Sequence, residues 1–121
     1  MEKTILTVDD SSTVRAILST MLLDAGYKVI EAVDGQDAIE QLEKRQINML
    51  ITDLNMPRVD GLDLIRHVRR SAGRRFMPII MLTSEGDDVK RQAGKTAGAS
   101  GWIMKPFKSE QLMKVVKMVL A

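Results

Sequence analysis

The stretch TILTVDDSSTVRAILSTMLLD, residues 4–24, decides the fold, because its periodicity changes from that of a strand to that of a helix within a few residues. Its first part, Thr4–Val8, is a short run rich in β-branched residues, which is typical of a buried strand. The part from Ser11 to Asp24 has apolar residues at helical spacing, in a single stripe made of Val14, Ile17, Leu18, Met21 and Leu22. A serine can cap the start of this helix, and Gly26 can end it. The stretch therefore predicts a strand followed directly by a helix.

Four more units of the same kind follow along the chain. The expected strands are short and apolar: Lys28–Ala32, Met49–Thr52, Pro78–Leu82 and Gly101–Met104. The expected helices are 36–44 behind an Asp34 cap, 62–73, 87–98, and a last helix capped by Ser109 with Leu112, Val115, Val116, Val119 and Leu120 facing inward. Short strands that are apolar on both faces are buried parallel strands with helices on both sides. We therefore predict a single doubly wound (βα)5 flavodoxin-like α/β domain, whose five-stranded parallel sheet has the order 2-1-3-4-5.

The composition is that of an ordinary folded domain. The chain has 121 residues, of which 45% are hydrophobic and 28% charged, and it contains no cysteine. A chain of this length buries enough surface to fold without staples, and the lack of cysteine excludes a disulfide framework, a cysteine zinc site and a thiol nucleophile. We expect one soluble, cytoplasmic domain over residues 1–121, with no signal peptide and no membrane insertion, because every apolar run is too short to cross a bilayer.

The charges are divided unevenly along the chain. Residues 1–60 carry eleven acids and six bases, whereas residues 61–121 carry five acids and twelve bases. One basic set lies on the polar face of the third helix and the turn after it: Arg66, Arg69, Arg70, Arg74 and Arg75. The sequence has no helix-turn-helix signature and only four aromatic residues for base stacking. We therefore interpret this set as a solvated face and expect no nucleic-acid partner.

Polar residues follow four of the five expected strands. In an open parallel sheet, ligands bind beyond the carboxyl ends of the strands. The first strand is followed by Asp9 and Asp10, the third by Asp53 and then Asn55, the fourth by Thr83, Ser84 and Glu85, and the fifth by Lys105 and Pro106. The second strand, which lies to one side in this order, ends in the apolar residues Ala32 and Val33. We therefore expect a functional site at the edge formed by the other four strands.

The chemistry of this edge points to a phosphoryl group. Two carboxylates about 4 Å apart repel each other by about 4 kcal/mol at an effective dielectric near 20, so a cation is expected among Asp9, Asp10 and Asp53. Hard oxygen ligands without histidine or cysteine favour Mg²⁺ or Mn²⁺. Lys105 supplies a positive charge and Thr83 a hydroxyl donor, which together suit a phosphoryl group. Asp53 stands alone on the central strand and is our choice of nucleophile.

Four motifs carry a resemblance to a known family. They are VDDS at 8–11, ITDLNMP at 51–57, MLTS at 81–84 and GASGWIMKPF at 98–107. On these motifs the sequence resembles, along its whole length, the receiver domains of two-component response regulators, and most closely their stand-alone chemotaxis (CheY-like) type. The resemblance implies that Asp53 accepts a phosphoryl group from a histidine kinase. It implies that Asp9, Asp10, Asp53 and the backbone carbonyl of Asn55 hold Mg²⁺, and that Thr83 and Lys105 sense the phosphoryl group.

The same resemblance implies roles for residues around the phosphoacceptor. Asn55 and Glu85 occupy positions that tune how quickly the phosphoryl group is lost. Trp102 stands where the family usually has a tyrosine or phenylalanine that acts as an aromatic switch. The bond between Lys105 and Pro106 is expected to be cis.

We predict from these features a phosphoacceptor switch of a two-component system and not a conventional turnover enzyme. Phosphorylation would draw Thr83 and Lys105 inward and change the surface of the fourth helix, fifth strand and fifth helix, which then binds a target. The fourth helix suits this role because Gly94 weakens it, and we expect only Val89, Ala93 and Ala97 on its apolar face. The implied partners are a sensor histidine kinase, an output protein such as a flagellar motor switch protein, and a phosphatase, and the process is chemotaxis.

Three other functions remain open. A receiver of this kind could relay phosphate outside chemotaxis. An unmodified binding module, such as a flavin mononucleotide carrier, could cradle phosphate at Ser11–Thr13, although Asp9 and Asp10 would repel it and aromatics to stack the flavin are lacking. A phosphatase would use Asp53 as nucleophile, but Asn55 stands where its second acid is expected.

Several residues also have plainer interpretations. Asp9 and Asp10 alone could be caps of the first helix. Trp102 could be packing only, and His67, which lies off the apolar stripe of its helix, is interpreted as a surface histidine. The nine methionines, among them Met21, Met81 and Met118, are expected to fill the core.

Overall fold

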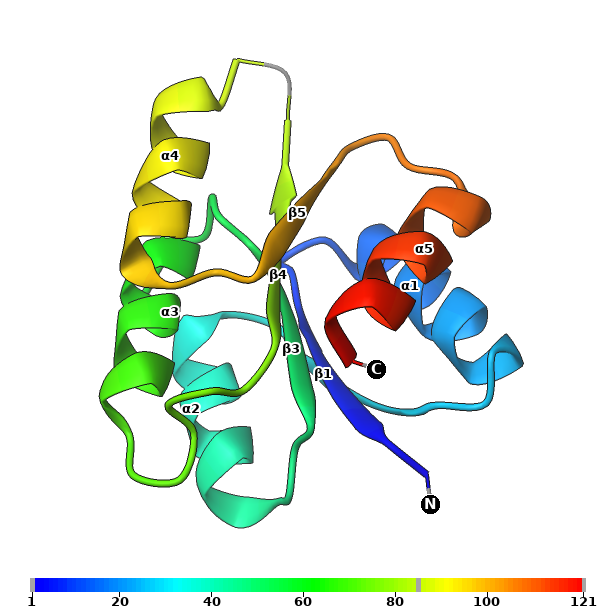
Figure 1. Cartoon of the computed structure of the whole chain (residues 1–121), viewed down its shortest axis with the longest axis horizontal. Helices are drawn as coiled ribbons and strands as arrows, with labels where there is room; N and C mark the ends of the chain where they lie inside the picture. Colours follow the sequence, from blue (N-terminus) through cyan, green and yellow to red (C-terminus); the bar gives the residue numbers. More distant parts are fainter. Residues whose placement is uncertain (1, 85, 121) are drawn as a thin grey trace.

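The computed structural model describes residues 2–84 and 86–120 and contains one parallel sheet between two layers of helices (Figure 1). The strands are β1 (Thr4–Val8), β2 (Lys28–Ala32), β3 (Met49–Asp53), β4 (Ile79–Thr83) and β5 (Gly101–Met104). The helices are α1 (Ser12–Asp24), α2 (Gly35–Lys44), α3 (Gly61–Arg70), α4 (Asp88–Ala97) and α5 (Ser109–Leu120). The strand order is β2-β1-β3-β4-β5, with every neighbouring pair parallel, so the predicted fold and order are confirmed.

The two faces of the sheet carry separate halves of the core. Helices α1 and α5 cover one face, and α2, α3 and α4 cover the other (Figure 1). Alternate residues of each strand point to opposite faces. Thus Ile5 and Ile51 pack with Leu18, Leu22, Leu112 and Val116 on the first face, whereas Leu6 and Leu50 pack with Leu42, Leu64, Ile65 and Val68 on the second. No helix in the described ranges is long and apolar enough to span a membrane.

The helix starts are set by side-chain caps, as predicted for two of them. The Ser11 side chain accepts from the backbone N–H of Val14 at 3.3 Å, and the Asp34 side chain accepts from that of Asp37 at 2.8 Å. The prediction that Ser109 is a cap is wrong, because α5 already begins at Ser109. The third helix ends at Arg70 and not at residue 73, because Ser71 already has an extended conformation. Differences of this size are common at helix ends, which are held by few internal hydrogen bonds.

Four expectations about buried side chains are wrong. The edge strands β2 and β5 are not buried on both faces, because each has a neighbour on one side only. Ile17 of the α1 stripe is 44% exposed. Two methionines do not fill the core, because Met104 is 44% and Met118 72% exposed. Val89 is also exposed, because Gly94 and not Val89 faces the sheet from α4.

Gly94 allows α4 to approach the sheet closely. A Cβ atom built on Gly94 would lie 2.0 Å from the sulfur of Met81, which is buried in β4. The glycine that weakens the helix intrinsically is therefore also the residue on which the helix packs.

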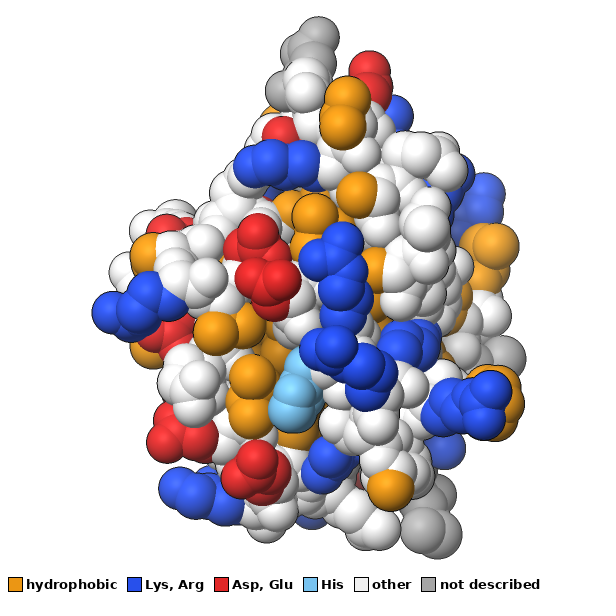
Figure 2. Space-filling view, turned by 90° about the vertical axis from the view of Figure 1, so that its left-hand side faces the viewer, with side chains coloured by type: hydrophobic (Ala, Val, Ile, Leu, Met, Phe, Trp, Pro, Cys, Tyr) orange, Lys and Arg blue, Asp and Glu red, His pale blue; other side chains and the backbone are white. Residues whose placement is uncertain are grey.

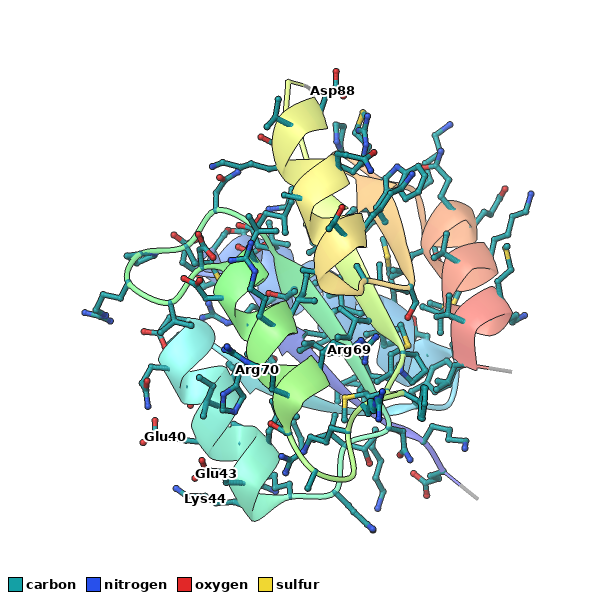
Figure 3. All side chains as sticks on the ribbon, turned by 60° about the vertical axis from the view of Figure 1, so that its left-hand side comes forward. Glu40, Glu43, Lys44, Arg69, Arg70 and Asp88 are labelled. Atoms are coloured by element: carbon teal, nitrogen blue, oxygen red, sulfur yellow. The ribbon has the colours of Figure 1, made fainter. Side chains whose placement is uncertain are left out.

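The C-terminal end of α4 is held by an arginine of α3. Gly98 has a left-handed φ of 117°, and its carbonyl oxygen accepts from Nε and Nη2 of Arg69 at 2.9 and 2.7 Å. Figure 3 shows Arg69 beneath that end of α4, whereas Arg70 points outward. Burial lowers the pKa of Arg69. The interpretation of the whole basic set as solvated is therefore wrong for Arg69, and also for Arg74, which donates to the carbonyl of Leu42.

The remaining arginines of the set lie on the outer surface. Arg66, Arg70 and Arg75 are exposed, and His67 is half-buried beside them. Figure 2 shows Lys and Arg side chains gathered along the middle of this face, with most Asp and Glu side chains to one side of them. The three arginines are exposed, and Arg66 pairs with Asp63 at 3.6 Å, which supports the interpretation of a solvated surface for these residues.

Candidate functional site at the carboxyl edge of the sheet

Three carboxylates meet at the carboxyl ends of β1 and β3. Asp9 and Asp10 follow β1, and Asp53 is the last residue of β3. Each offers an oxygen, and these oxygens lie within 4.8 Å of one another. Asp9 is fully buried, Asp53 is 7% exposed, and Asp10 is exposed to solvent. The structure thus brings together the three acids that the sequence assigned to this edge.

The backbone and side-chain contacts around Asp9 hold its carboxylate in place. Oδ1 of Asp9 accepts from the backbone N–H of Ser11 at 2.9 Å, at the start of α1. The carbonyl oxygen of Asp9 accepts from Nη1 of Arg15 at 2.6 Å, and Arg15 also pairs with Glu31 of β2. Asp9 is therefore positioned by α1 on one side and by the edge strand on the other. Sequence reasoning missed Arg15, to which it assigned no role.

Asp53 is placed by a close approach of α3 to the end of β3. A Cβ atom on Gly61 would lie 2.3 Å from the carbonyl oxygen of Asp53, so only glycine fits there without a shift. The backbone N–H of Asn55 lies 3.5 Å from Oδ1 of Asp53. Burial raises the pKa of Asp53, and the nearby Asp9 carboxylate raises it further, while Lys105 opposes both effects. The carboxylate is thus held in a place where its negative charge is unfavourable without a cation.

Lys105 supplies one cation to both buried acids. Its Nζ lies 2.9 Å from Oδ2 of Asp9 and 3.5 Å from Oδ1 of Asp53. Burial lowers the pKa of Lys105, but the contacts with these two carboxylates outweigh it and leave the pKa raised. The Lys105–Pro106 peptide bond is cis, as the resemblance implied. One lysine facing two carboxylates leaves the group of three acids with an excess of negative charge.

Two further predicted residues lie on β4 and β5. Thr83 is the last residue of β4 and is 1% exposed, and its hydroxyl lies 3.5 Å from the carbonyl oxygen of Ile103. Trp102 of β5 is 40% exposed and turned outward, with Nζ of Lys95 4.1 Å from its ring centroid and the guanidinium of Arg91 5.7 Å away. Glu85, also expected at this edge, lies outside the described residues.

The side chain of Asn55 is engaged by the start of α4. Its Nδ2 donates to Oδ2 of Asp87 at 3.4 Å, and its Oδ1 accepts from Nζ of Lys90. Sequence reasoning assigned no role to Asp87 or Lys90. Asp87 and Lys90 stand three residues apart at the start of α4, which is visible in the sequence. That they contact Asn55, in the loop after β3, could not be predicted from this spacing.

The donor set fits a hard divalent cation. Three carboxylates with close oxygens and no sulfur or imidazole among them suit Mg²⁺ or Mn²⁺, and a backbone carbonyl at Asn55 is available as a further oxygen. Burial and the nearby Asp9 carboxylate raise the pKa of Asp53, and a cation bound here would favour its charged form. The fold and this edge define the class of the protein as an open α/β domain with an acidic, lysine-flanked ligand site beyond its central strands.

Comparison with known proteins identifies the family within that class. Residues 5–117 match the model of the response regulator receiver domain. Chemotaxis protein CheY1 of Helicobacter pylori (strain ATCC 700392 / 26695) is 41% identical over 118 residues, which cover 96% of this chain and 95% of that protein. The chain therefore belongs to the response regulator receiver domains, and the resemblance inferred from the motifs is confirmed.

Solved structures give the same result. Chemotaxis protein CheY4 of Vibrio cholerae has a TM-score of 0.94 and 41% identity, covering 99% of this chain and all of that one. The receiver domain of the sensor histidine kinase PA1611 from Pseudomonas aeruginosa PAO1, described with a magnesium ion in its active site cleft, has a TM-score of 0.90 and 28% identity, covering 99% of this chain and 98% of that one. The protein is thus a CheY-like receiver domain, and the members of this family are signalling phosphoacceptors.

Proposed function

We propose that residues 1–121 form one receiver domain that accepts a phosphoryl group on Asp53 from a sensor histidine kinase. An oxygen of the Asp53 carboxylate attacks the phosphorus of a phosphohistidine. The new P–O bond forms as the P–N bond breaks, and the electron pair leaves with the imidazole nitrogen, which takes up a proton. The product is an acyl phosphate on Asp53. The proposed location of this exchange is the cytoplasm.

The observation that carries the proposal is the position of Asp53 between Asp9 and Lys105. Of the three acids, Asp53 alone lies on the central strand, with the lysine ammonium 3.5 Å from its Oδ1. Asp9, Asp10 and Asp53 would hold Mg²⁺ together with the backbone carbonyl of Asn55, and the ion would neutralise charge on the phosphoryl oxygens. Lys105 is placed to bind a phosphoryl oxygen, because its ammonium already faces the oxygens from which that group would extend.

Thr83 and Trp102 would pass the change to the surface. A phosphoryl group on Asp53 offers oxygens to the Thr83 hydroxyl, whose present contact with Ile103 is long at 3.5 Å and easily exchanged. Movement of Thr83 would alter the packing beside Trp102 on the neighbouring strand. In this proposal Trp102 acts as the aromatic switch, and Glu85 and Asn55 tune the loss of the phosphoryl group.

The surface of α4, β5 and α5 is the proposed docking site for the output partner. It exposes Trp102 and Met104 and contains a depression of about 440 Å³ with Gln111 and Val115 on its wall. The chemotaxis proteins among the relatives support a role in chemotaxis, with an output partner such as a flagellar motor switch protein, and a phosphatase to end the signal. We propose no nucleic-acid partner and no membrane insertion.

A second candidate is a phosphorelay outside chemotaxis. The receiver domain of PA1611, at 28% identity, belongs to a sensor histidine kinase, so the same fold also serves proteins of another kind. The chemistry at Asp53 would be identical, and only the donor and acceptor of the phosphoryl group would differ.

The test is intact mass after incubation with a small phosphodonor, with and without Mg²⁺. We expect a gain of one phosphoryl group that needs Mg²⁺ and is absent in Asp53→Asn. Trp102 is the single tryptophan, so its fluorescence followed in parallel reports whether β5 responds. No gain under any condition, with the protein folded, would contradict the proposal.

A further inference from the structure

The amide of Asn55 is occupied at both of its ends. Nδ2 donates to Oδ2 of Asp87, and Oδ1 accepts from Nζ of Lys90. Oδ2 of Asp87 also accepts from the backbone N–H of Ser84 at 2.8 Å, which ties the β4–α4 loop into the same set of contacts. We call Asn55, Asp87 and Lys90 the Asn55 clamp. The clamp joins the loop after β3 to the first turn of α4.

The N-cap residue of α4, Asp87, takes part in the clamp and does not cap the helix with its side chain. At the N-caps of α1, α2 and α3, a serine or aspartate side chain accepts a backbone N–H of the first turn. Asp87 stands at the same position of α4, yet its side chain makes no such bond. Since a cap of this kind normally stabilises a helix, an aspartate turned instead toward Ser84 and Asn55 marks these contacts as a distinct feature of the site.

The clamp lies beside the phosphoacceptor. Asn55 is two residues after Asp53, and its backbone N–H lies 3.5 Å from Oδ1 of Asp53. The side chain of Asn55 leans from this point across the sheet edge to α4, on the solvent side of the site. The orientation of its amide is therefore set by Asp87 and Lys90, neither of which contacts Asp53.

We propose that Lys90 and Asp87 are positioning residues that slow the loss of the phosphoryl group from Asp53 to water, an inference that rests on the proposed function. In that loss, the oxygen of a water molecule attacks phosphorus, and the bond from phosphorus to the Asp53 oxygen breaks. Its electron pair returns to the carboxylate, and inorganic phosphate leaves with the water oxygen while the excess proton passes to solvent. With one N–H bound to Asp87 and the oxygen bound by Lys90, the amide is fixed in one orientation and cannot turn to orient that water. Released from the clamp, the same amide could hydrogen-bond the water or uncover its approach, and the loss would be faster.

The experiment measures the lifetime of the phosphorylated protein by intact mass, after rapid removal of the phosphodonor at constant Mg²⁺. The variant is Lys90→Met, which keeps most of the side-chain length but cannot donate to Asn55. The matched control is Asp88→Asn, because Asp88 is in the same turn of α4 and pairs with Arg91 and not with the clamp. We expect the lifetime of Lys90→Met to be about fivefold shorter, the effect of losing one ordinary hydrogen bond, and that of the control to be unchanged.

A double variant separates positioning from general damage to α4. If Lys90 acts through the amide, Lys90→Met should have no further effect in an Asn55→Ala background, and Lys90→Arg should restore the lifetime. An unchanged or longer lifetime in Lys90→Met, or an effect that persists without Asn55, would overturn the inference and leave the proposed function standing. Failure of the wild type to gain a phosphoryl group at all would overturn both.

Discussion

The substitution Asp53→Asn should make the protein more stable in the absence of Mg²⁺. At an effective dielectric near 20, unit charges at the 4.8 Å limit between Asp9 and Asp53 repel by about 3.5 kcal/mol, and charges 3.5 Å apart, as for Lys105 and Asp53, attract by about 4.7 kcal/mol. The repulsion by Asp9 and the attraction by Lys105 therefore nearly cancel. The cost of burying the Asp53 carboxylate, which is 7% exposed, then determines whether its charge destabilises the fold. Burying an ion costs several kcal/mol before pairing, so we expect the neutral side chain to stabilise the fold by about 1 to 2 kcal/mol at neutral pH.

The sign of the pH dependence follows from the raised pKa of Asp53. Because the pKa in the folded protein lies above the ordinary 3.8, the folded state keeps a proton that the unfolded state has already lost. Folding stability of the wild type therefore falls as pH rises through the interval between these two values, and Asp53→Asn lacks this loss. The stability advantage of the variant should be full at neutral pH and vanish below about pH 4, where the carboxyl is protonated in both states.

The assay is urea unfolding followed by far-ultraviolet circular dichroism, with a chelator present, at neutral and at acidic pH. Saturating Mg²⁺ should reverse the order, because the ion binds the folded wild type more tightly than the variant. Asp63→Asn is the control, since Asp63 is an exposed partner of Arg66 outside the site, and we expect a change of less than about 0.5 kcal/mol. A variant that is less stable than the wild type without Mg²⁺, or an advantage that does not depend on pH, would refute the reasoning.

Three more predictions concern single contacts. Lys105→Met removes the cation that two buried carboxylates share and should destabilise the Mg²⁺-free protein by about 2 kcal/mol in urea unfolding, with partial recovery on adding Mg²⁺; no loss would contradict the pairing. Gly94→Ala places a methyl group against the sulfur of Met81 and should lower the free energy of unfolding by about 1 to 2 kcal/mol, despite the better helix propensity of alanine; a more stable variant would show that α4 can move away freely. Lys95→Ala uncovers one face of Trp102, so acrylamide should quench the tryptophan emission more efficiently than in the wild type; equal quenching would rule out the stacked arrangement.

The fold and the central residues of the site were predictable because both depend on local patterns. Runs such as Met49–Thr52 are apolar on both faces, and the segments between them have the apolar spacing of amphipathic helices. These two patterns in alternation predict a doubly wound parallel sheet. In such a sheet the residue at the carboxyl end of each central strand must come to the same edge. Asp9, Asp53 and Lys105 could therefore be placed together without knowledge of any side-chain conformation.

The contacts that were missed depend on the direction in which long or polar side chains leave their helices. Arginine is a residue type usually found on the surface. Arg69 caps α4 only because the carbonyl oxygen of Gly98, 29 residues later, comes within reach of its guanidinium. Val89 looks like a core residue, but Gly94 determines which side of α4 faces the sheet. The Asn55 clamp likewise joins segments more than 30 residues apart, so no periodicity in the sequence carries it.

The most direct measurement of the central claim identifies the residue that carries the phosphoryl group. The phosphorylated protein is treated with borohydride, which reduces an acyl phosphate to the corresponding alcohol, and is then digested and mapped by mass spectrometry. The account predicts homoserine at residue 53 only, formed only when Mg²⁺ was present during phosphorylation. Reduction at Asp9 or Asp10, or a phosphoryl group retained on His67, would contradict it.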